Sequence, residues 1–244
     1  MRFVLVHGGF HGAWCWEKLI PELAARGHQA IAIDCPGHGK RAGEDATLAG
    51  YRDAVVEVIE PGDIVVGHSM GGFTTTVAVD AAIDRVRHVV YLAAGVPNEG
   101  EPMTAAGAGR TSQRTSIVEL IDDGRKMAMT SKQAAADFFF HDCSQDIIDW
   151  AWERLTPQPM KPMTEPISTP RFWAASLPRS LILCRQDRAS GAGEAGNIRT
   201  SQRLGVEPLW LDTSHSPFLS QPAACAEAIL ESLKRPGLGP ISPN

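Results

Sequence analysis

Short apolar runs alternate with longer amphipathic segments along most of the chain. Six of these runs are rich in valine, isoleucine and leucine with little alternation, which is typical of strands covered on both faces. They lie at residues 3–6, 30–33, 63–66, 88–92, 180–184 and 208–211. Helical patterns are found at residues 14–26, 47–59, 70–82, 193–204 and 221–234. Strands separated by helices predict an α/β fold with a doubly wound, mainly parallel sheet of six strands.

Residues 97–177 depart from this pattern, with many methionines, the run FFF at 138–140 and a proline-rich stretch at 155–170. Three helices are expected inside this segment, at residues 115–123, 131–139 and 144–154. An insertion of this size after the fourth strand predicts a lid over the carboxyl edge of the sheet, where α/β folds bind ligands. The alternative is an extra helical layer that does not contact substrate. Residues 1–96 and 178–244 then form the core domain.

Composition narrows the class of protein. A formal net charge of −5 gives no electrostatic reason to expect nucleic acid or an anionic membrane as a partner. The five cysteines are scattered and form no C-x-x-C pair, which argues against a disulfide framework or a zinc site and favours a reducing compartment. The chain lacks an apolar stretch of membrane-spanning length and a signal-peptide pattern. A cytoplasmic protein without a bound metal is expected.

The sequence VVGHSMGG, at residues 65–72, carries the first chemical signal. It contains GHSMG, which fits the motif G-x-S-x-G directly after a predicted strand and before a predicted helix. A nucleophile elbow requires that context, because its tight turn exposes the serine hydroxyl and tolerates only small neighbours. The N-terminus of the following helix favours developing negative charge. Ser69 is therefore the candidate nucleophile, and a turn that needs small residues for packing alone is the alternative.

Two further residues complete a candidate set for nucleophilic catalysis, since a serine needs a base and the base needs a carboxylate to orient it. His215 follows the last predicted strand in the sequence DTSHSPF, on a loop that can reach the elbow. Asp187 follows the fifth strand, so the residues occur in the order serine, aspartate, histidine that accompanies G-x-S-x-G on this architecture. Asp212 is the competing carboxylate, but its position three residues before the histidine makes a side-on approach to the ring awkward.

The glycine-rich sequence HGGFHG, at residues 7–12, follows the first predicted strand. It fits an oxyanion loop, in which a backbone N–H of this turn acts together with the N–H of the residue after the nucleophile. Gly9 or Phe10 would supply the first N–H, and Met70 the second. A dinucleotide site is the alternative, since a helix and an acidic residue follow the turn. That fingerprint requires glycine where His7 stands and leaves the serine motif without a role, so no cofactor is expected.

Together these residues resemble one family, the α/β-hydrolases, over essentially the whole chain. Residues 7–39 look like the opening of its compact branch, which contains plant methylesterases, hydroxynitrile lyases and small bacterial esterases, among them carbendazim-type carbamate and pyrethroid hydrolases. Residues 142–163 are similar to the lid of the bacterial members, and DCPGHG at 34–39 replaces the plant pattern DLAASG. The resemblance implies a catalytic triad and an oxyanion hole made by Ser69, Asp187, His215, Gly9 and Met70. It implies structural roles for His7 and His68.

The function expected from this combination is hydrolysis of small hydrophobic carboxylic esters or carbamate esters through an acyl-enzyme. A small-molecule ester is then the partner, and Trp152 in the insertion is a candidate for contact with it. One alternative keeps the fold but cleaves carbon–carbon bonds or cyanohydrins. In the related hydroxynitrile lyases a lysine follows the catalytic histidine and a threonine lies in the oxyanion turn, where this chain has Ser216 and Gly8. A non-catalytic ligand receptor is the remaining alternative, and the intact triad argues against it.

Overall fold

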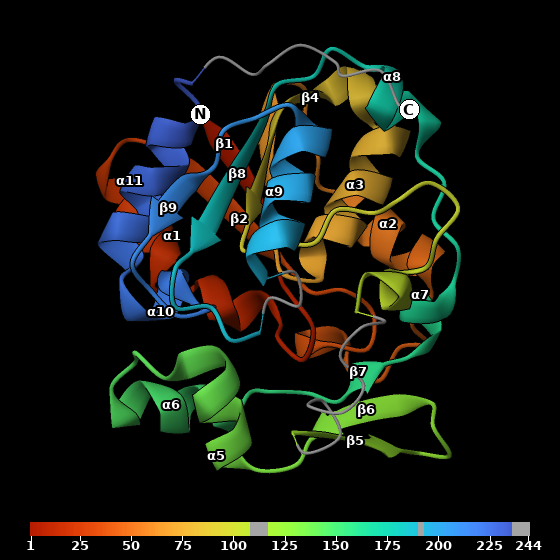
Figure 1. Ribbon diagram of the computed structural model, residues 1–244, viewed down its shortest axis with the longest axis vertical. Coiled ribbons are helices and arrows are strands. Elements are labelled where there is room, and N and C mark those ends of the chain that lie inside the picture. The colour runs from red at the N-terminus through yellow and green to blue at the C-terminus, as the bar shows by residue number, and fades with distance from the viewer. Residues whose placement is uncertain (108–116, 190–192, 236–244) are drawn as a thin grey trace.

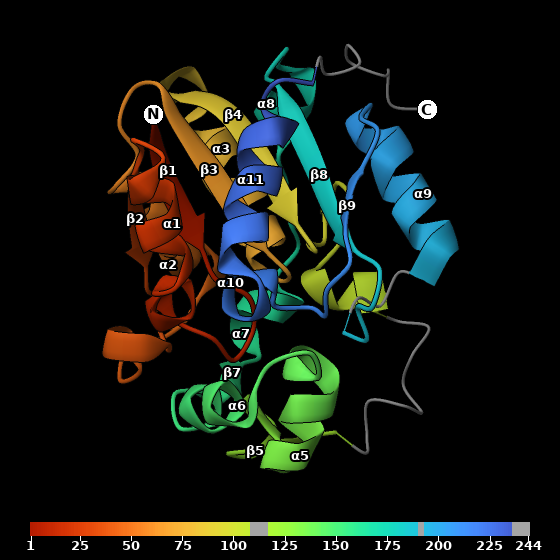
Figure 2. The ribbon, with the colours of Figure 1, turned by 90° about the vertical axis from the view of Figure 1, so that its left-hand side faces the viewer.

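A twisted sheet with helices on both faces forms the main body of the protein, as the computed structural model shows for residues 1–107, 117–189 and 193–235 (Figure 1, Figure 2). The sheet has six parallel strands in the order β2-β1-β3-β4-β8-β9. Their bounds are β1 Arg2–Val6, β2 Gln29–Ile33, β3 Asp63–His68, β4 Val86–Leu92, β8 Arg179–Cys184 and β9 Leu209–Leu211. Each strand overlaps one of the six predicted runs. The predicted α/β fold with a parallel six-stranded sheet is confirmed.

Alternate residues along the strands serve opposite faces of this sheet. Val4 and Val6 pack into one apolar cluster with the helices of one face, while Phe3 and Leu5 pack into a second cluster with the helices of the other. The first face carries α2 Leu48–Val56, α3 Gly71–Ala81 and α9 Gly193–Leu204, and the second carries α1 Leu19–Ala25 and α11 Pro222–Ser232. Burial on both faces explains why the strands are almost uniformly apolar.

Helix α1 is shorter than the helix predicted at residues 14–26. A 3₁₀ turn at Ala13–Trp16 precedes α1, so the segment 14–26 is not one continuous helix. Pro21 lacks the N–H that would bond to the carbonyl four residues earlier, and this favours a helix start just before the proline. The other four core helices begin and end within two residues of their predicted bounds, except that α2 ends at Val56 and not at residue 59.

The insertion between β4 and β8 contains both strands and helices. A small antiparallel sheet has the order β5-β6-β7, with β5 Val118–Ile121, β6 Lys126–Met129 and β7 Gln158–Pro159. Its helices are α5 Lys132–Ala135, which continues as a π-helical turn at Ala136–Phe140, α6 Gln145–Trp152, α7 Lys161–Thr164 and α8 Pro170–Ala174. The predicted helices at 131–139 and 144–154 therefore exist, although the first is partly π-helical.

The predicted helix at 115–123 is wrong where the structure describes it. Residues 118–121 form strand β5, and residues 115 and 116 lie outside the described part of the chain. Asp122 and Asp123 follow with φ of +56° and +52°, so the chain turns back at once into β6. Gly124 follows with φ of +79°, so three successive left-handed residues lie in the four-residue connection 122–125, and aspartate and glycine are among the residues that tolerate this conformation.

The insertion divides between two places. Figure 1 and Figure 2 show β5, α5 and α6 grouped beyond the carboxyl ends of the parallel strands. Helix α8 instead packs on α3, where the Phe172 N–H donates to Asp80 Oδ1 at 2.8 Å and the Phe172 ring is fully buried. One part thus lies where a lid is expected, and another is an added helical layer. None of the described helices has both the length and the apolar character that a bilayer span requires.

Candidate active site

Ser69 lies between β3 and α3 on a turn with φ of +54°. A non-glycine residue in this region is strained, and such strain concentrates at functional positions. The turn is also tight, since a Cβ at Gly67 would lie 2.8 Å from Gly71 O, and a Cβ at Gly71 would lie 2.7 Å from Val6 O. Steric fit thus explains both glycines of G-x-S-x-G. Ser69 itself is half-buried, although the residues on either side of it are buried.

His215 lies on the loop between β9 and α10 (Pro217–Ser220), with its side chain buried. Its Nδ1 is 2.9 Å from Asp187 Oδ2. A carboxylate accepts, so Nδ1 carries the proton and Nε2 of a neutral ring is left as the basic atom. That Nε2 is buried without a hydrogen-bond partner among the described residues. The competing Asp212 instead accepts from Gln186 Nε2 at 2.9 Å, so the structure brings Asp187 to the histidine ring.

His68, the residue before Ser69, connects the elbow to the histidine loop, residues 212–216, which carries His215. Its ring centroid is 4.6 Å from that of His215, and its Nε2 is 2.9 Å from the His215 carbonyl oxygen. A carbonyl only accepts, so Nε2 is the protonated nitrogen. Burial holds the pKa of His68 well below its usual value, and the ring is therefore neutral near pH 7. His68 thus fixes the backbone of the loop directly beside Ser69.

Two buried histidines orient the glycine-rich turn after β1. His7 Nδ1 donates to Gly8 O at 2.8 Å. His11 Nδ1 donates to Gly9 O at 2.7 Å. Burial lowers the pKa of both rings, that of His11 to about 3, so each is a neutral donor. Because a trans peptide places N–H opposite C=O, the Gly9 N–H points away from His7.

Gly9 and Met70, which carry the two expected oxyanion donors, are neighbours through the Met70 side chain. A Cβ at Gly9 would be 3.7 Å from Met70 Sδ. Among the described residues, neither the Gly9 N–H nor the Met70 N–H donates to another protein group. The Phe10 N–H, considered as an alternative donor, donates to Gln158 Oε1 at 3.4 Å. Gly9 and Met70 are therefore the pair with N–H groups still available to a ligand.

Similarity to known proteins identifies the family of this chain. A model of the "Alpha/beta hydrolase family" matches residues 3–228. The chain belongs to the alpha/beta hydrolase family. Norfluorocurarine synthase 1 of a Strychnos species is 30% identical over 79% of this chain and 80% of its own length. Esterase PIR7B of Oryza sativa is 34% identical over 55% of this chain and 53% of its own length. The family predicted from the sequence motifs is confirmed.

A solved hydrolase structure has the same fold. The pyrethroid hydrolase from Sphingobium faniae superposes with a TM-score of 0.81, covering 97% of this chain and 98% of that one, at 23% identity. At that identity the similarity shows a shared fold alone. The chemistry of the present chain must be argued from its own residues.

Three insertion residues contact the candidate site; the sequence marked Phe139 as part of the run FFF at 138–140 and did not single out Asp142 or Gln158. The Phe139 ring lies 5.7 Å from the His215 ring and 6.0 Å from the Phe10 ring, measured between centroids. Asp142 Oδ2 accepts from the Ser214 N–H at 2.8 Å. Gln158 contacts the oxyanion turn, as described above. Each contact joins segments 70 or more residues apart, so local sequence patterns carry no sign of them.

Trp152, the insertion residue expected to contact substrate, ends α6. It is half-buried and packs against the apolar cluster that includes Phe10 and Phe139. It therefore belongs to the same cluster as the aromatic residues beside His215. A role in substrate contact stays a prediction.

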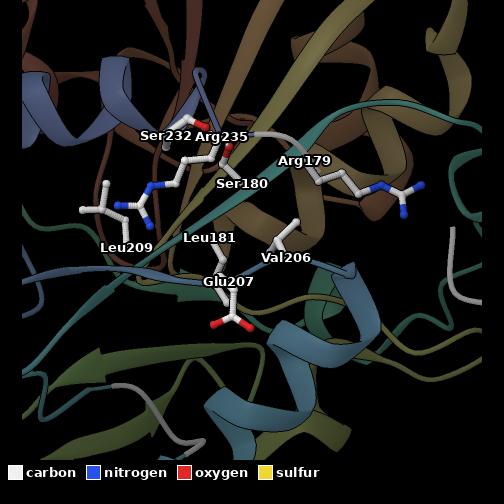
Figure 3. A pocket seen from close by; sticks show the side chains of 8 residues that line it. All are labelled: Arg179, Ser180, Leu181, Val206, Glu207, Leu209, Ser232 and Arg235. Atoms are coloured by element: carbon white, nitrogen blue, oxygen red, sulfur yellow. Dashed lines mark hydrogen bonds between the residues drawn. The ribbon is translucent and has the colours of Figure 1, made fainter. Parts of the chain in front are cut away.

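A cavity of about 90 Å³ elsewhere in the hydrolase is unrelated to this site. Figure 3 shows Ser180, Leu181 and Val206 around it, near the amino end of β8. Arg179 points away from the cavity in that view, and its guanidinium donates to the Phe172 carbonyl. The volume corresponds to roughly three water molecules. Ligands in this architecture bind at the opposite, carboxyl edge of the sheet.

Proposed function

We propose that this chain hydrolyses small hydrophobic esters with Ser69 as the nucleophile and His215 as the base. Asp187 is the carboxylate that orients the His215 ring. Its esterase relative, PIR7B, supports carboxylic ester hydrolysis as the activity. The observation that carries the assignment of residues is the 2.9 Å contact between His215 Nδ1 and Asp187 Oδ2. That contact leaves the basic Nε2 without a partner on a loop that is bonded to the residue before Ser69.

The reaction proceeds in two steps. Ser69 attacks the ester carbonyl as His215 Nε2 takes its proton, and the N–H groups of Gly9 and Met70 hold the oxyanion. The imidazolium then donates the proton to the leaving alcohol, which gives an acyl-enzyme. Water activated by His215 attacks that intermediate and releases the acid. Asp187 stabilises the imidazolium in both steps.

The substrate class we propose is an ester of a small, apolar acid or carbamic acid. Apolar side chains adjoin the site, since Phe139 lies 5.7 Å from the His215 ring and 6.0 Å from the Phe10 ring, and apolar lining with few polar groups is typical of small-molecule pockets. By its name, the neighbour from Sphingobium faniae hydrolyses pyrethroids, which also favours an apolar ester. The insertion residues near Phe139 then act as a lid over bound ester.

Pre-steady-state kinetics with p-nitrophenyl acetate test this function. The wild-type chain should release a burst of nitrophenol equal to one acyl group per chain. Ser69→Ala should lower kcat by roughly 10⁴-fold or more, and adding His215→Ala should cost little further, because triad members act as a unit. Near wild-type turnover by Ser69→Ala would contradict the mechanism.

A substrate panel tests the class. Nitrophenyl esters of increasing acyl length, a methyl carbamate and a bulky pyrethroid-like ester should all depend on Ser69. Mandelonitrile tests the lyase alternative, and no cyanide above the spontaneous rate is expected. Saturable, Ser69-dependent cyanide release without ester turnover would replace hydrolysis by cyanohydrin cleavage.

A further inference from the structure

A short stretch of the insertion, residues 156–159, holds the oxyanion turn by hydrogen bonds. The Thr156 N–H donates to Phe10 O at 2.8 Å, and Thr156 Oγ1 lies 3.4 Å from the same oxygen. The Phe10 N–H donates to Gln158 Oε1 at 3.4 Å. Both backbone groups of Phe10 are thus bonded to one segment that is distant in sequence. The turn is held by the core on one side, through His7 and His11, and by the insertion on the other.

Phe10 needs such support because its φ is +65°. A bulky residue in the left-handed region is strained, and such a conformation persists only when surrounding contacts fix it. The N–H of Gly9 belongs to the adjacent peptide group. Rotation of the Phe10 backbone toward a relaxed conformation would therefore turn the Gly9 N–H away from the oxyanion.

Gln158 is suited to this task because its own amide has a fixed orientation. The side chain is fully buried, and its Nε2 donates to Pro159 O at 2.8 Å and to the Tyr51 hydroxyl at 3.2 Å. Pro159 O can only accept, so the NH₂ group must face it and Oε1 must face Phe10. A Cβ at Gly9 would lie 3.3 Å from Oε1, so this oxygen is in contact with the turn itself.

A polar chain stabilises this orientation from the core. The Tyr51 hydroxyl, on α2, also lies 3.0 Å from His38 Nε2, and His38 Nδ1 lies 3.1 Å from Thr156 Oγ1. The chain therefore runs from Gln158 through Tyr51 and His38 back to Thr156. Buried networks in which each member is satisfied give a rigid local structure.

We infer that Gln158 is a positioning residue, which fixes the oxyanion turn through the Phe10 N–H and so keeps the Gly9 N–H aimed at the developing oxyanion. This inference rests on the proposed function, since it assumes attack by Ser69 and an oxyanion hole at Gly9 and Met70. Gln158 acts on the transition state more than on bound ester, because the oxyanion exists only after attack.

Gln158→Met is the main test, since methionine keeps the length and approximate volume of glutamine but cannot accept the Phe10 N–H. kcat should fall roughly 10- to 100-fold, less than the loss expected when an oxyanion donor itself is removed, with KM within about threefold. Ser180→Ala is the matched control. It removes buried hydrogen bonds to His88 and the Ser232 carbonyl at the opposite edge of the sheet, and kcat should be unchanged.

A transition-state analogue separates positioning from general loss of structure. A trifluoromethyl ketone forms a tetrahedral oxyanion with the serine, whereas the matching methyl ketone reports ground-state binding. In Gln158→Met the inhibition constant of the fluorinated ketone should rise by the same factor by which kcat/KM falls, and that of the methyl ketone should stay constant. Values within about twofold of wild type for kcat and for the fluorinated ketone would overturn the inference, as would equal weakening of both ketones.

Two further measurements keep the outcomes distinct. If Gln158→Met does not unfold cooperatively, Gln158→Asn, which withdraws the amide by one methylene group, is judged by the same criteria. A fluorophosphonate probe reports the nucleophile independently of ester turnover. Failure of the wild-type chain both to react with this probe at Ser69 and to hydrolyse esters would refute the proposed function, whereas a reactive wild type with an unaffected Gln158→Met refutes the positioning role alone.

Discussion

The nucleophile elbow and the histidine loop, residues 212–216, are neighbours that are fixed by different means. The elbow depends on steric fit among β1, β3 and α3, since a side chain at Gly67 or Gly71 would collide with backbone. Its contacts come from the core of the fold. A tight backbone turn of this kind has few alternative conformations, so its geometry follows from the fold itself.

The histidine loop depends on hydrogen bonds, which come from His68 in the core and also from the insertion. Asp142 accepts from the Ser214 N–H at 2.8 Å, and Ser214 Oγ donates to Phe139 O at 3.1 Å. Single hydrogen bonds contribute about 1 kcal/mol each, so such a loop is more easily displaced than the elbow. The insertion therefore holds the loop of His215, the proposed base, beside Ser69, the proposed nucleophile, in addition to its proposed part in covering substrate.

The largest expected effect is on the histidine side. Asp187→Asn should lower kcat by about 10⁴-fold, because an asparagine no longer stabilises the imidazolium and favours the wrong tautomer. Asp212→Asn is the matched control, since its carboxylate contacts Gln186 and not the ring, and should change kcat by less than about threefold. Steady-state kinetics with a short nitrophenyl ester measure both. A larger loss in Asp212→Asn would show that Asp212, and not Asp187, is the carboxylate that orients His215.

A substitution at Gly8 tests the steric side of the comparison. A Cβ there would lie 2.8 Å from Ser69 Cβ and 2.9 Å from His68 Nδ1. Gly8→Thr should therefore displace the nucleophile and lower kcat roughly 10²-fold or more. Gly43→Thr is the control, because a Cβ at that glycine meets no atom within 4 Å. Full ester activity in Gly8→Thr would mean that the elbow accommodates the added side chain without displacing Ser69.

Acid sensitivity tests how firmly the histidines behind both loops are buried. Burial lowers the pKa of His11 from 6.5 to about 3, so below pH 6.5 the unfolded chain binds a proton that the folded chain does not. This contribution to stability is complete above pH 6.5 and is lost as pH falls, by about 2 kcal/mol near pH 5. Urea unfolding near pH 7 and pH 5 measures the loss.

His11→Gln should remove that share of the pH dependence, because glutamine does not titrate. His28→Gln is the control, since its ring is only half-buried. If wild type and His11→Gln lost the same stability between the two pH values, His11 would not be the buried neutral donor that holds Gly9 O.

A smaller effect is expected when one insertion contact to the histidine loop is removed. Asp142→Ala leaves the Ser214 N–H without its acceptor and should lower kcat roughly 10-fold and stability by about 1 kcal/mol. Glu153→Ala, an exposed carboxylate at the end of α6, serves as control. Unchanged kinetics in Asp142→Ala would show that the remaining contacts of the loop, with His68 and Phe139, are sufficient to hold it in place.

The smallest effect concerns selectivity. Trp152→Ala should change the preference for acyl chain length a few-fold while the rate with an acetyl ester stays close to wild type, because Trp152 belongs to the cluster around Phe139 and not to the reacting groups. A series of nitrophenyl esters measures this preference. An unchanged series would leave Trp152 a packing residue.

Local signals in the sequence were sufficient for the core. Apolar runs located all six parallel strands, and the spacing of Gly67, Ser69 and Gly71 located the elbow, because both patterns follow from neighbours along the chain. The sequence predicts a helix where β5 lies, because four residues are too few to show a period; the pair Asp123-Gly124 in the following turn was the local signal for a hairpin.

Partners that are distant in sequence were beyond such signals. Gln158 lies 148 residues from Phe10 and 107 from Tyr51, and nothing in the sequence TPQP indicates either contact. The same holds for Asp142 and Ser214, 72 residues apart. The positions of these side chains depend on how the insertion packs on the core, which is a tertiary property.

The hydrogen bonds from residues 139–142 and 156–159 to the catalytic loops bear on how substrate range diversifies in this architecture. An inserted segment can be exchanged between related proteins only where the exchange leaves the structure of the core domain unaltered. Here two segments of the insertion hold the core loops; α6 lies between them in the chain, while the β5–β6 hairpin precedes both and pairs with β7 at Gln158. We therefore expect a swap confined to α6 to retain ester hydrolysis, whereas a swap that includes β6 or the whole insertion must also preserve the contacts of β7 with the turn at Phe10.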